Sequence, residues 1–307
     1  MIGGARTYAH TIMGCTRSGL DRAQTAHRLW ECCAIPGFLY GTEAMVVSKM
    51  TVKKLEMIQH MVAGLILQLP QSSSQVMGWM EAGLQPIQQR LDAKMVFFAH
   101  SLLSGKKDTI TKAVVDSVLA DATDPWTIRL RSILDAVGIK DLKSVSKASL
   151  RKRLHEHGIA QLQLLKTAHS SLKWLTEPRR WFKLQSHIND SDQCATLNRV
   201  RAGDAGLGNR RPNHMGLTYK TCPWCLSVGI QVKLDEQHVI LDCPASGHAR
   251  RATGVGIFLD ARLPLMTEES ILKELLGGDE ADVDTMNMRG HWVQTLLEEW
   301  KRVISQL

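Results

Sequence analysis

Apolar residues recur at three- and four-residue steps along this chain, and no other feature limits its fold as strongly. Over 51–69 the repeat comprises Val52, Leu55, Ile58, Val62, Leu65 and Leu69. Such spacing places the apolar side chains on one face of an α-helix. Similar patterns predict helices over 74–82, 86–104, 125–137, 148–167, 178–188, 191–202, 268–276 and 283–305. Only 230–242 resembles a short β-hairpin, so we expect a mainly α protein.

Start and stop signals divide these helices. Thr51 is a predicted N-cap and Pro70 a predicted stop for the first helix, and Asp124-Pro125 is a typical cap followed by a first turn. Thr267 is a predicted cap near the C-terminus. Polar or Gly-rich stretches between the helices predict three regions, namely a helical bundle over 1–105, a helical linker with basic faces over 106–202, and a small Cys/His domain with amphipathic helices over 203–307.

Charge is unevenly distributed along the 307 residues, whose formal net charge is +8. Residues 147–183 contain nine Lys or Arg against Glu156 and Glu177, and 199–233 contain six against Asp204 alone. The segment 260–307 is reversed, with ten acids and five bases. A solvated basic face would explain this pattern, but its concentration in two neighbouring segments favours a surface that faces phosphates.

The most specific local motif is Cys222-Pro-Trp-Cys225 followed by His238 and Cys243, which has the form C-x2-C-x12-H-x4-C. Three thiolates and one imidazole complete a tetrahedral shell, so we predict one structural Zn²⁺. The alternatives are four ordinary buried residues or a redox CxxC pair, although a thioredoxin-like site needs a βαβ context that the flanks lack. Four further cysteines have no partner at ligand spacing and are interpreted as buried small hydrophobes: Cys15, Cys32, Cys33 and Cys194.

Basic and aromatic residues alternate once, at Arg179-Arg180-Trp181-Phe182-Lys183. Arginine and tryptophan together can hold a nucleic-acid backbone and stack on bases. Trp181 is equally well explained as a core residue. Trp224, between the two paired cysteines, can either stack on a base or cover the metal site.

Familiar catalytic motifs are missing from the sequence. It contains no GxxxxGK loop, no G-x-S-x-G and no adjacent Asp pair of the kind that holds two metals in a polymerase. We therefore expect neither an enzyme nor a small-molecule substrate. No run of about 18 apolar residues occurs, so we expect no membrane span.

Residues 28–103 resemble the region just beyond the catalytic palm in reverse transcriptases of non-LTR (LINE-like) retrotransposons. The similar stretches are 36–43 (PGFLYGTE), 53–59 (KKLEMIQ), 69–72 (LPQS) and 83–90 (GLQPIQQR). A second similarity is Arg199-Val-Arg201-Ala-Gly203 leading to the Cys/His motif and its exit Asp242-Cys243-Pro244. The resemblance implies a helical thumb that grips the primer–template duplex, followed by a CCHC zinc knuckle.

Because the fingers and palm of that family would lie before residue 1, the resemblance implies the C-terminal third of a reverse transcriptase without its own catalytic centre. It also implies an intracellular protein, with the nucleus favoured. The leading hypothesis is an RNA- or DNA-binding module, in which Lys53 and Lys54 face duplex phosphates. The remaining predicted contacts lie on the basic segments and before the knuckle: Arg151, Lys152, Arg153, Arg179, Arg180, Trp181, Arg210, Arg211 and Lys220.

Two alternatives remain open. In the first, the protein is a helical interaction scaffold, in which the zinc holds a small domain together and the amphipathic C-terminal helix binds a protein partner. In the second, the chain is part of a polymerase whose remaining domains come from another chain.

Overall fold

The computed structural model describes residues 1–15, 22–71, 73–104, 110–167, 188, 191–203, 221–262, 265–276 and 283–306. The described residues are mainly helical, which confirms the predicted class. They contain no β-strand, and Thr221 and Lys233 form an isolated antiparallel bridge. None of the described helices is both long and apolar enough to cross a membrane.

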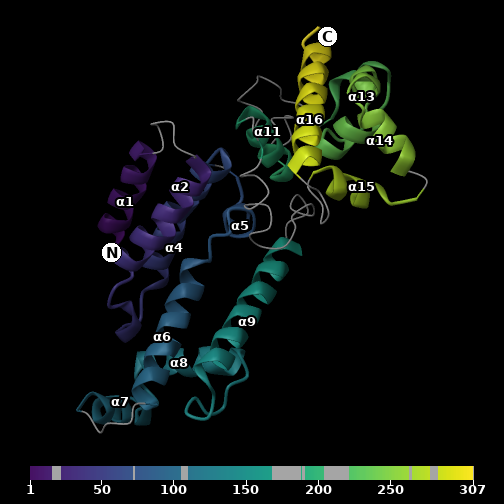
Figure 1. The fold of residues 1–307 in the computed structure, drawn as a ribbon. Helices are drawn as coiled ribbons and strands as arrows, with labels where there is room; N and C mark the ends of the chain where they lie inside the picture. Colours follow the sequence, from purple (N-terminus) through teal and green to yellow (C-terminus); the bar gives the residue numbers. More distant parts are fainter. Residues whose placement is uncertain are drawn as a thin grey trace. The chain divides into compact units, whose positions relative to one another are not determined.

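The chain forms two compact units, shown in Figure 1. Unit 1 comprises 1–62 and 84–165, and unit 2 comprises 63–83 and 166–307. The chain therefore passes from unit 1 to unit 2 within the helix α4 (Lys49–Leu67), returns, and leaves again near the end of α9 (Lys147–Thr167). The predicted boundaries at 105 and 202 stay a prediction.

Unit 1 is built from helices at the N-terminus and in the middle of the chain. Their bounds are α1 Ile2–Cys15, α2 Arg22–Leu29, η1 Trp30–Ala34, α3 Ile35–Phe38, η2 Thr42–Ala44, α4 Lys49–Leu67, α6 Ile87–Leu103, α7 Ile110–Ala120, α8 Pro125–Ala136 and α9 Lys147–Thr167.

The ends of α4 and α6 are fixed by side chains. The hydroxyl of Ser48 accepts a hydrogen bond from Thr51 N at 3.2 Å, so Ser48 rather than the predicted Thr51 caps α4. Gln68, with a φ of 53°, ends the helix before Pro70. Glu56 of α4 in turn accepts a hydrogen bond from Ile87 N at 2.6 Å and thereby satisfies a free amide at the start of α6.

An apolar cluster holds α6, α8 and the first turn of α9 together. It contains Met95, Val96, Ala99, Trp126, Leu130, Ile133, Ile139, Leu142 and Leu150. The predicted cap of α8 is confirmed, because the carboxylate of Asp124 accepts a hydrogen bond from Thr127 N at 2.8 Å. This packing buries Leu150 and leaves the neighbouring Arg151, Lys152 and Arg153 in solvent.

Unit 2 contains a short helix from the first half of the chain and the whole C-terminal half. Its bounds are α5 Gln75–Met80, α11 Ser191–Arg201, α12 Pro223–Ser227, η4 His238–Asp242, η5 Pro244–Ser246, α13 Gly247–Ala252, α14 Val255–Arg262, α15 Glu268–Leu275 and α16 Val283–Ile304.

The long helix α16 packs against α11, η4, η5 and α13 (Figure 1). The apolar face of this helix largely faces the core, since Met286, Leu296 and Trp300 are fully or almost fully buried. Trp292 is half-buried and lies against Gly254.

The hairpin predicted over 230–242 is wrong. Asp235 accepts a hydrogen bond from His238 N at 2.9 Å and starts a helical turn that continues to Asp242. Residues 230–234 form no strand, although Lys233 takes part in the bridge and Val232 O accepts a hydrogen bond from Cys222 N at 2.9 Å. The helix predicted over 178–188 lies outside the described residues except for Ile188.

Candidate functional site

The four residues of the C-x2-C-x12-H-x4-C motif converge in unit 2. One ligand atom from each of Cys222, Cys225, His238 and Cys243 lies within 4.8 Å of the other three, and all four residues are buried. The sulfurs of Cys222 and Cys243 are 3.6 Å apart. Cys225 Sγ lies 3.4 Å from His238 Nε2. This buried Cys3His group can hold one metal ion.

The first two ligands are placed by a tight turn. Cys222 precedes α12, whose first residue is Pro223, and Cys225 lies one turn later in this helix. The chain then reverses at Gly229, where φ is +81°, a conformation that favours glycine. Ile230 N donates to Cys225 O at 2.7 Å. The turn therefore directs both sulfurs to the same point.

The other two ligands come from η4 and the residue that follows it. Cys243 N donates to His238 O at 2.7 Å, which brings the sulfur back beneath the imidazole. The hydroxyl of Ser246 donates to Cys243 O at 2.9 Å and to Val239 O at 2.6 Å. Backbone and side-chain hydrogen bonds thus help to position the four ligand residues.

Burial governs the ionisation of these ligands. It raises the pKa of the Cys225 thiol to about 12, with the adjacent Cys222 and Cys243 adding to the effect. Burial and Cys222 also raise the pKa of Cys243. Burial lowers the pKa of His238, so its ring is neutral at pH 7 and has a lone pair available for a metal.

Trp300 of α16 is a neighbour of the metal-ligand cluster. Its side chain is completely buried, and its indole nitrogen donates to no acceptor among the described residues. The indole N–H nevertheless interacts with the sulfur of Cys243 and lowers the pKa of that thiol, although burial, the larger effect, raises it. A metal-bound thiolate at Cys243 would be the acceptor that this buried donor otherwise lacks.

The predicted nucleic-acid contacts divide into described and undescribed residues. Lys53 and Lys54 are exposed on α4, and Arg151, Lys152 and Arg153 are exposed on α9. Six other residues lie outside the described ranges: Arg179, Arg180, Trp181, Arg210, Arg211 and Lys220.

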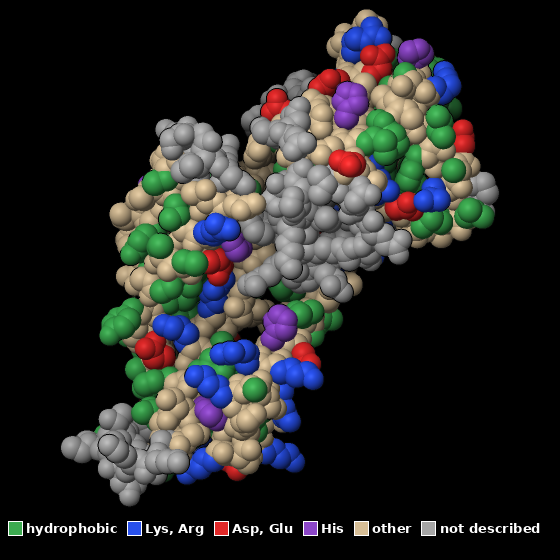
Figure 2. Space-filling view, viewed as in Figure 1, with side chains coloured by type: hydrophobic (Ala, Val, Ile, Leu, Met, Phe, Trp, Pro, Cys, Tyr) green, Lys and Arg blue, Asp and Glu red, His purple; other side chains and the backbone are tan. Residues whose placement is uncertain are grey.

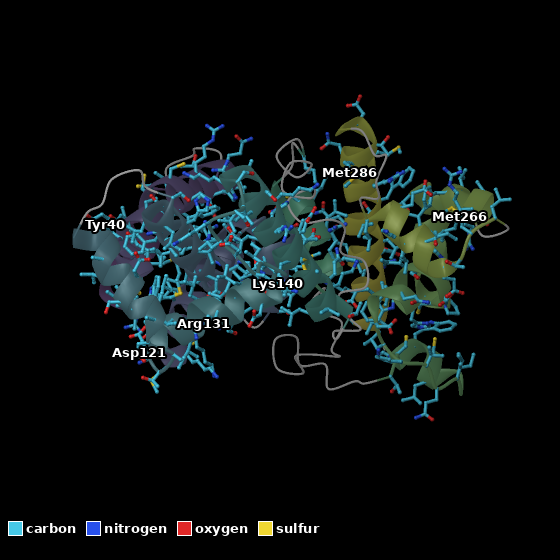
Figure 3. The ribbon with its side chains drawn as sticks, turned by 90° about the horizontal axis from the view of Figure 1, so that it is seen from below. Tyr40, Asp121, Arg131, Lys140, Met266 and Met286 are labelled. Carbon is cyan, nitrogen blue, oxygen red and sulfur yellow. The ribbon has the colours of Figure 1, made fainter. Side chains whose placement is uncertain are left out.

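Exposed cations concentrate where α8, its connection to α9 and the start of α9 meet. The basic cluster consists of Arg131, Lys140, Lys143, Lys147, Arg151, Lys152 and Arg153. The guanidinium of Arg153 donates to Gly138 O at 2.9 Å, which holds α9 against the connection. Figure 2 shows Lys and Arg side chains gathered over this part of unit 1, and Figure 3 shows Arg131 and Lys140 within it.

Four exposed acidic residues lie in or beside the segments of the basic cluster: Asp121, Asp135, Asp141 and Glu156. Lys152 Nζ lies 3.9 Å from the Glu156 carboxylate, and both side chains are well exposed, so this pair is weak. Arg151 has no carboxylate partner among the described residues. The cations outnumber these acids, so this surface of unit 1 carries a net positive charge.

Two interpretations from the sequence need correction. Arg201, counted among the basic residues of 199–233, is fully buried and paired with Glu81 through bonds of 2.8 and 2.9 Å. Its partner is 120 residues away, so no local pattern could reveal it. Cys15, Cys32 and Cys33 are exposed and Cys194 is half-buried, because the helices that carry them turn these positions outward.

Neither a protein-family model, nor a curated protein, nor a solved structure matches this chain.

Proposed function

We propose that this protein binds RNA or DNA through the basic cluster of unit 1. The observation that carries the proposal is the set of seven exposed cations on α8, α9 and their connection, among which Arg151 has no carboxylate partner in the described residues. Cations of this kind displace counterions from phosphates and give affinity without sequence choice. Lys53 and Lys54, also exposed in unit 1, are proposed as further phosphate contacts.

We also propose that the Cys3His group binds one structural zinc ion. Tetrahedral zinc with ~2.3 Å bonds to sulfur and ~2.0–2.1 Å bonds to nitrogen places two sulfurs about 3.8 Å apart and sulfur and nitrogen about 3.5 Å apart. The corresponding distances here are 3.6 and 3.4 Å. Four protein ligands leave no position for a substrate, so the ion would supply folding energy rather than catalysis.

The resemblance of residues 28–103 and of the Cys/His motif to non-LTR reverse transcriptases supports a more specific proposal. In it, the chain is the C-terminal region of a non-LTR reverse transcriptase, with α4 and α6 in the thumb and the zinc site as the knuckle. The chain would hold a primer–template without extending it. Template-directed extension by the purified 307-residue protein would contradict this, whereas an in-frame aromatic-x-Asp-Asp sequence upstream of Met1 in the gene would support it.

The decisive test is binding of fluorescent oligonucleotides at several salt concentrations. Each lost phosphate contact on a single strand should reduce the slope of log K against log salt by ~0.7. Replacing Arg151, Lys152 and Arg153 together with alanine should therefore flatten the slope by about 2 and weaken binding to all sequences alike.

The matched control replaces Arg6, Arg28 and Arg251, three exposed arginines outside the basic cluster, with alanine. This variant has the same net charge, so its slope should stay close to that of the intact protein. Equal slopes for both triple variants would move the binding surface away from α9. No binding by the intact protein at low salt would reject the proposal.

A protein-interaction scaffold is the second candidate function. Leu226, Val228 and Ile230 follow the first two metal ligands, and each is 51% exposed. A group of exposed apolar side chains on a turn that metal ligands would hold in place is typical of a protein-binding surface. Replacement of all three with serine should leave oligonucleotide affinity unchanged under the nucleic-acid hypothesis, while a scaffold would lose its partner.

A further inference from the structure

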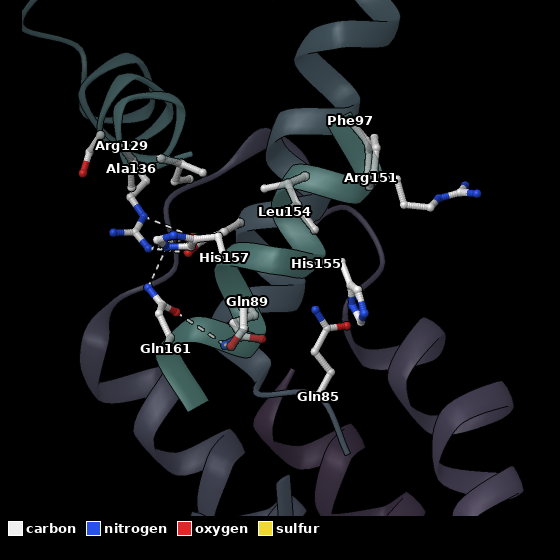
Figure 4. Close-up of a pocket in the computed structure, with 15 residues that line it drawn as sticks. Gln85, Gln89, Phe97, Arg129, Ala136, Arg151, Leu154, His155, His157 and Gln161 are labelled. Carbon is white, nitrogen blue, oxygen red and sulfur yellow. Dashed lines mark hydrogen bonds and ion pairs between the residues drawn. The ribbon is translucent and has the colours of Figure 1, made fainter. Parts of the chain in front are cut away.

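A cavity of about 330 Å³ lies within unit 1 between α6, α8 and α9 (Figure 4). This volume is at the small end of the range for ligand pockets, which is ~300–1,000 Å³. Polar side chains form much of its lining, including Gln85, Gln89, His155 and His157. Phe97 adds an aromatic surface. The cavity adjoins the basic cluster, because Arg151 belongs to both.

The walls of the cavity are held by specific contacts. A Cβ at Gly158 would lie 2.7 Å from Gln89 Oε1, so glycine lets α9 approach α6 closely. Gln89 Nε2 donates to Gly158 O at 3.2 Å across this contact. Between α6 and α8, Arg129 Nη2 donates to both carboxylate oxygens of Asp92 at 2.7 Å. The cavity is therefore pre-formed.

Two lining groups are available to a ligand. The side-chain amide of Gln85 and the imidazole of His155 make no hydrogen bond to the described residues. In Figure 4 these two side chains point toward each other. Arg151, which also lines the cavity, lies one helical turn before His155 on α9.

These groups match the parts of a nucleotide. A glutamine amide presents a donor and an acceptor side by side, the arrangement that pairs with the edge of a base. An imidazole can stack on the face of an unpaired base. A guanidinium binds phosphate oxygens through paired N–H groups. A free phosphate would use only the guanidinium.

We propose that this cavity receives one unpaired nucleobase, with Gln85 at its edge, His155 against its face and Arg151 on the adjoining phosphate. The inference rests on the proposed binding of nucleic acid and specifies a single-stranded segment. It assigns a role to polar residues that the phosphate surface does not use.

The test compares two single strands of equal length, one normal and one with abasic sites throughout, which keep the phosphates but lack bases. The full chain should bind the normal strand roughly tenfold more tightly, the scale of one good amide–base pairing. Gln85→Leu should reduce this preference to about one and leave affinity for the abasic strand unchanged. His155→Ala, at an exposed position that folding does not need, should reduce it as well.

Gln163→Leu is the matched control, since Gln163 lies on α9 but does not line the cavity. This variant should keep the full preference. Equal affinity of the intact protein for both strands would overturn the base pocket and leave the phosphate surface standing. Full preference in the Gln85 and His155 variants would place base recognition elsewhere. Absence of binding to either strand would instead reject the proposed function itself.

Discussion

Arg201 and Glu81 are fully buried and joined by two hydrogen bonds, and Arg201 also donates to Leu276 O. Removing one member leaves an uncompensated charge in the core, which costs ~3–5 kcal/mol. We therefore predict that Arg201→Met lowers the free energy of unfolding of unit 2 by this amount, as measured by urea denaturation. Arg199→Met, at an exposed position of the same helix, should change it by no more than ~0.5 kcal/mol.

The double variant Glu81→Met with Arg201→Met separates charge from packing. Because both charges are removed, most of the lost stability should return. A double variant as unstable as Arg201→Met would show that the guanidinium acts mainly through its contact with Leu276.

Trp300 tests whether the metal site extends beyond its four ligands. Trp300→Phe removes the indole N–H and keeps an aromatic ring, so metal affinity should fall ~10-fold or more, as is common for lost hydrogen bonds to ligands. Competition with a chelator measures this. Trp292→Phe on the same helix is the control and should leave metal affinity unchanged. Equal affinities for the two variants would contradict a role for the indole donor.

Metal affinity should rise with pH. The raised pKa values of Cys225 and Cys243 mean that both thiols hold protons at neutral pH before metal binds. Binding must release these protons, and His238 releases none because its lowered pKa leaves it neutral. The logarithm of the affinity should therefore increase by about 2 or more per unit between pH 7 and 8. Chelator competition at several pH values measures the slope, and a pH-independent affinity would contradict the assignment.

Among the helices, α8 offers a clear test of capping. Asp124→Ala removes the acceptor for Thr127 N and should destabilise unit 1 by ~1 kcal/mol. Asp135→Ala, at an exposed position near the end of the same helix, provides the comparison and should cost much less. The loss should appear in the thermal unfolding of the intact chain, and equal effects at both positions would show that the cap is dispensable.

At the level of single helices, much of the structure could be predicted from the sequence. Periodicity and caps placed α4, α6, α8, α9, α11, α15 and α16 correctly, because each has an apolar stripe bounded by Ser, Asp, Thr, Pro or Gly. The hairpin prediction failed because the alternating apolar residues Ile230, Val232 and Leu234 resemble a strand, whereas the decisive signal is the single cap Asp235. The pairing of Glu56 with the start of α6 is tertiary, so no local pattern contains it.

For the molecule as a whole, too, contacts between distant segments could not be predicted from the sequence, and the metal site shows this. Its four ligands were predicted from spacing alone, because tetrahedral coordination restricts that spacing strongly. Trp300 and the cavity residues Gln85 and His155 were missed, since helices distant in sequence bring them to their places. A phosphate surface was predicted from charge, but the sequence could not distinguish exposed Arg151 from buried Arg201.

Metal removal should affect the two units differently. Because zinc binding and folding are coupled in such sites, chelation should increase amide exchange in α12 and η4. Amides in α4 before residue 63 and in α6 should keep their protection, since their unit 1 core contains no metal ligand. Hydrogen exchange read by mass spectrometry resolves these segments. A uniform increase across both units would contradict independent cores.

The burial of Glu81 against Arg201 also has a consequence for synthesis on the ribosome. Glu81 emerges 120 residues before its partner, a delay of roughly 6–24 s at ~5–20 residues per second. During this interval its carboxylate cannot be buried with its cation, so 63–83 must wait while helices translated on either side of it can already pack. A nascent chain stalled before residue 201 should therefore expose this segment to proteases and chaperones.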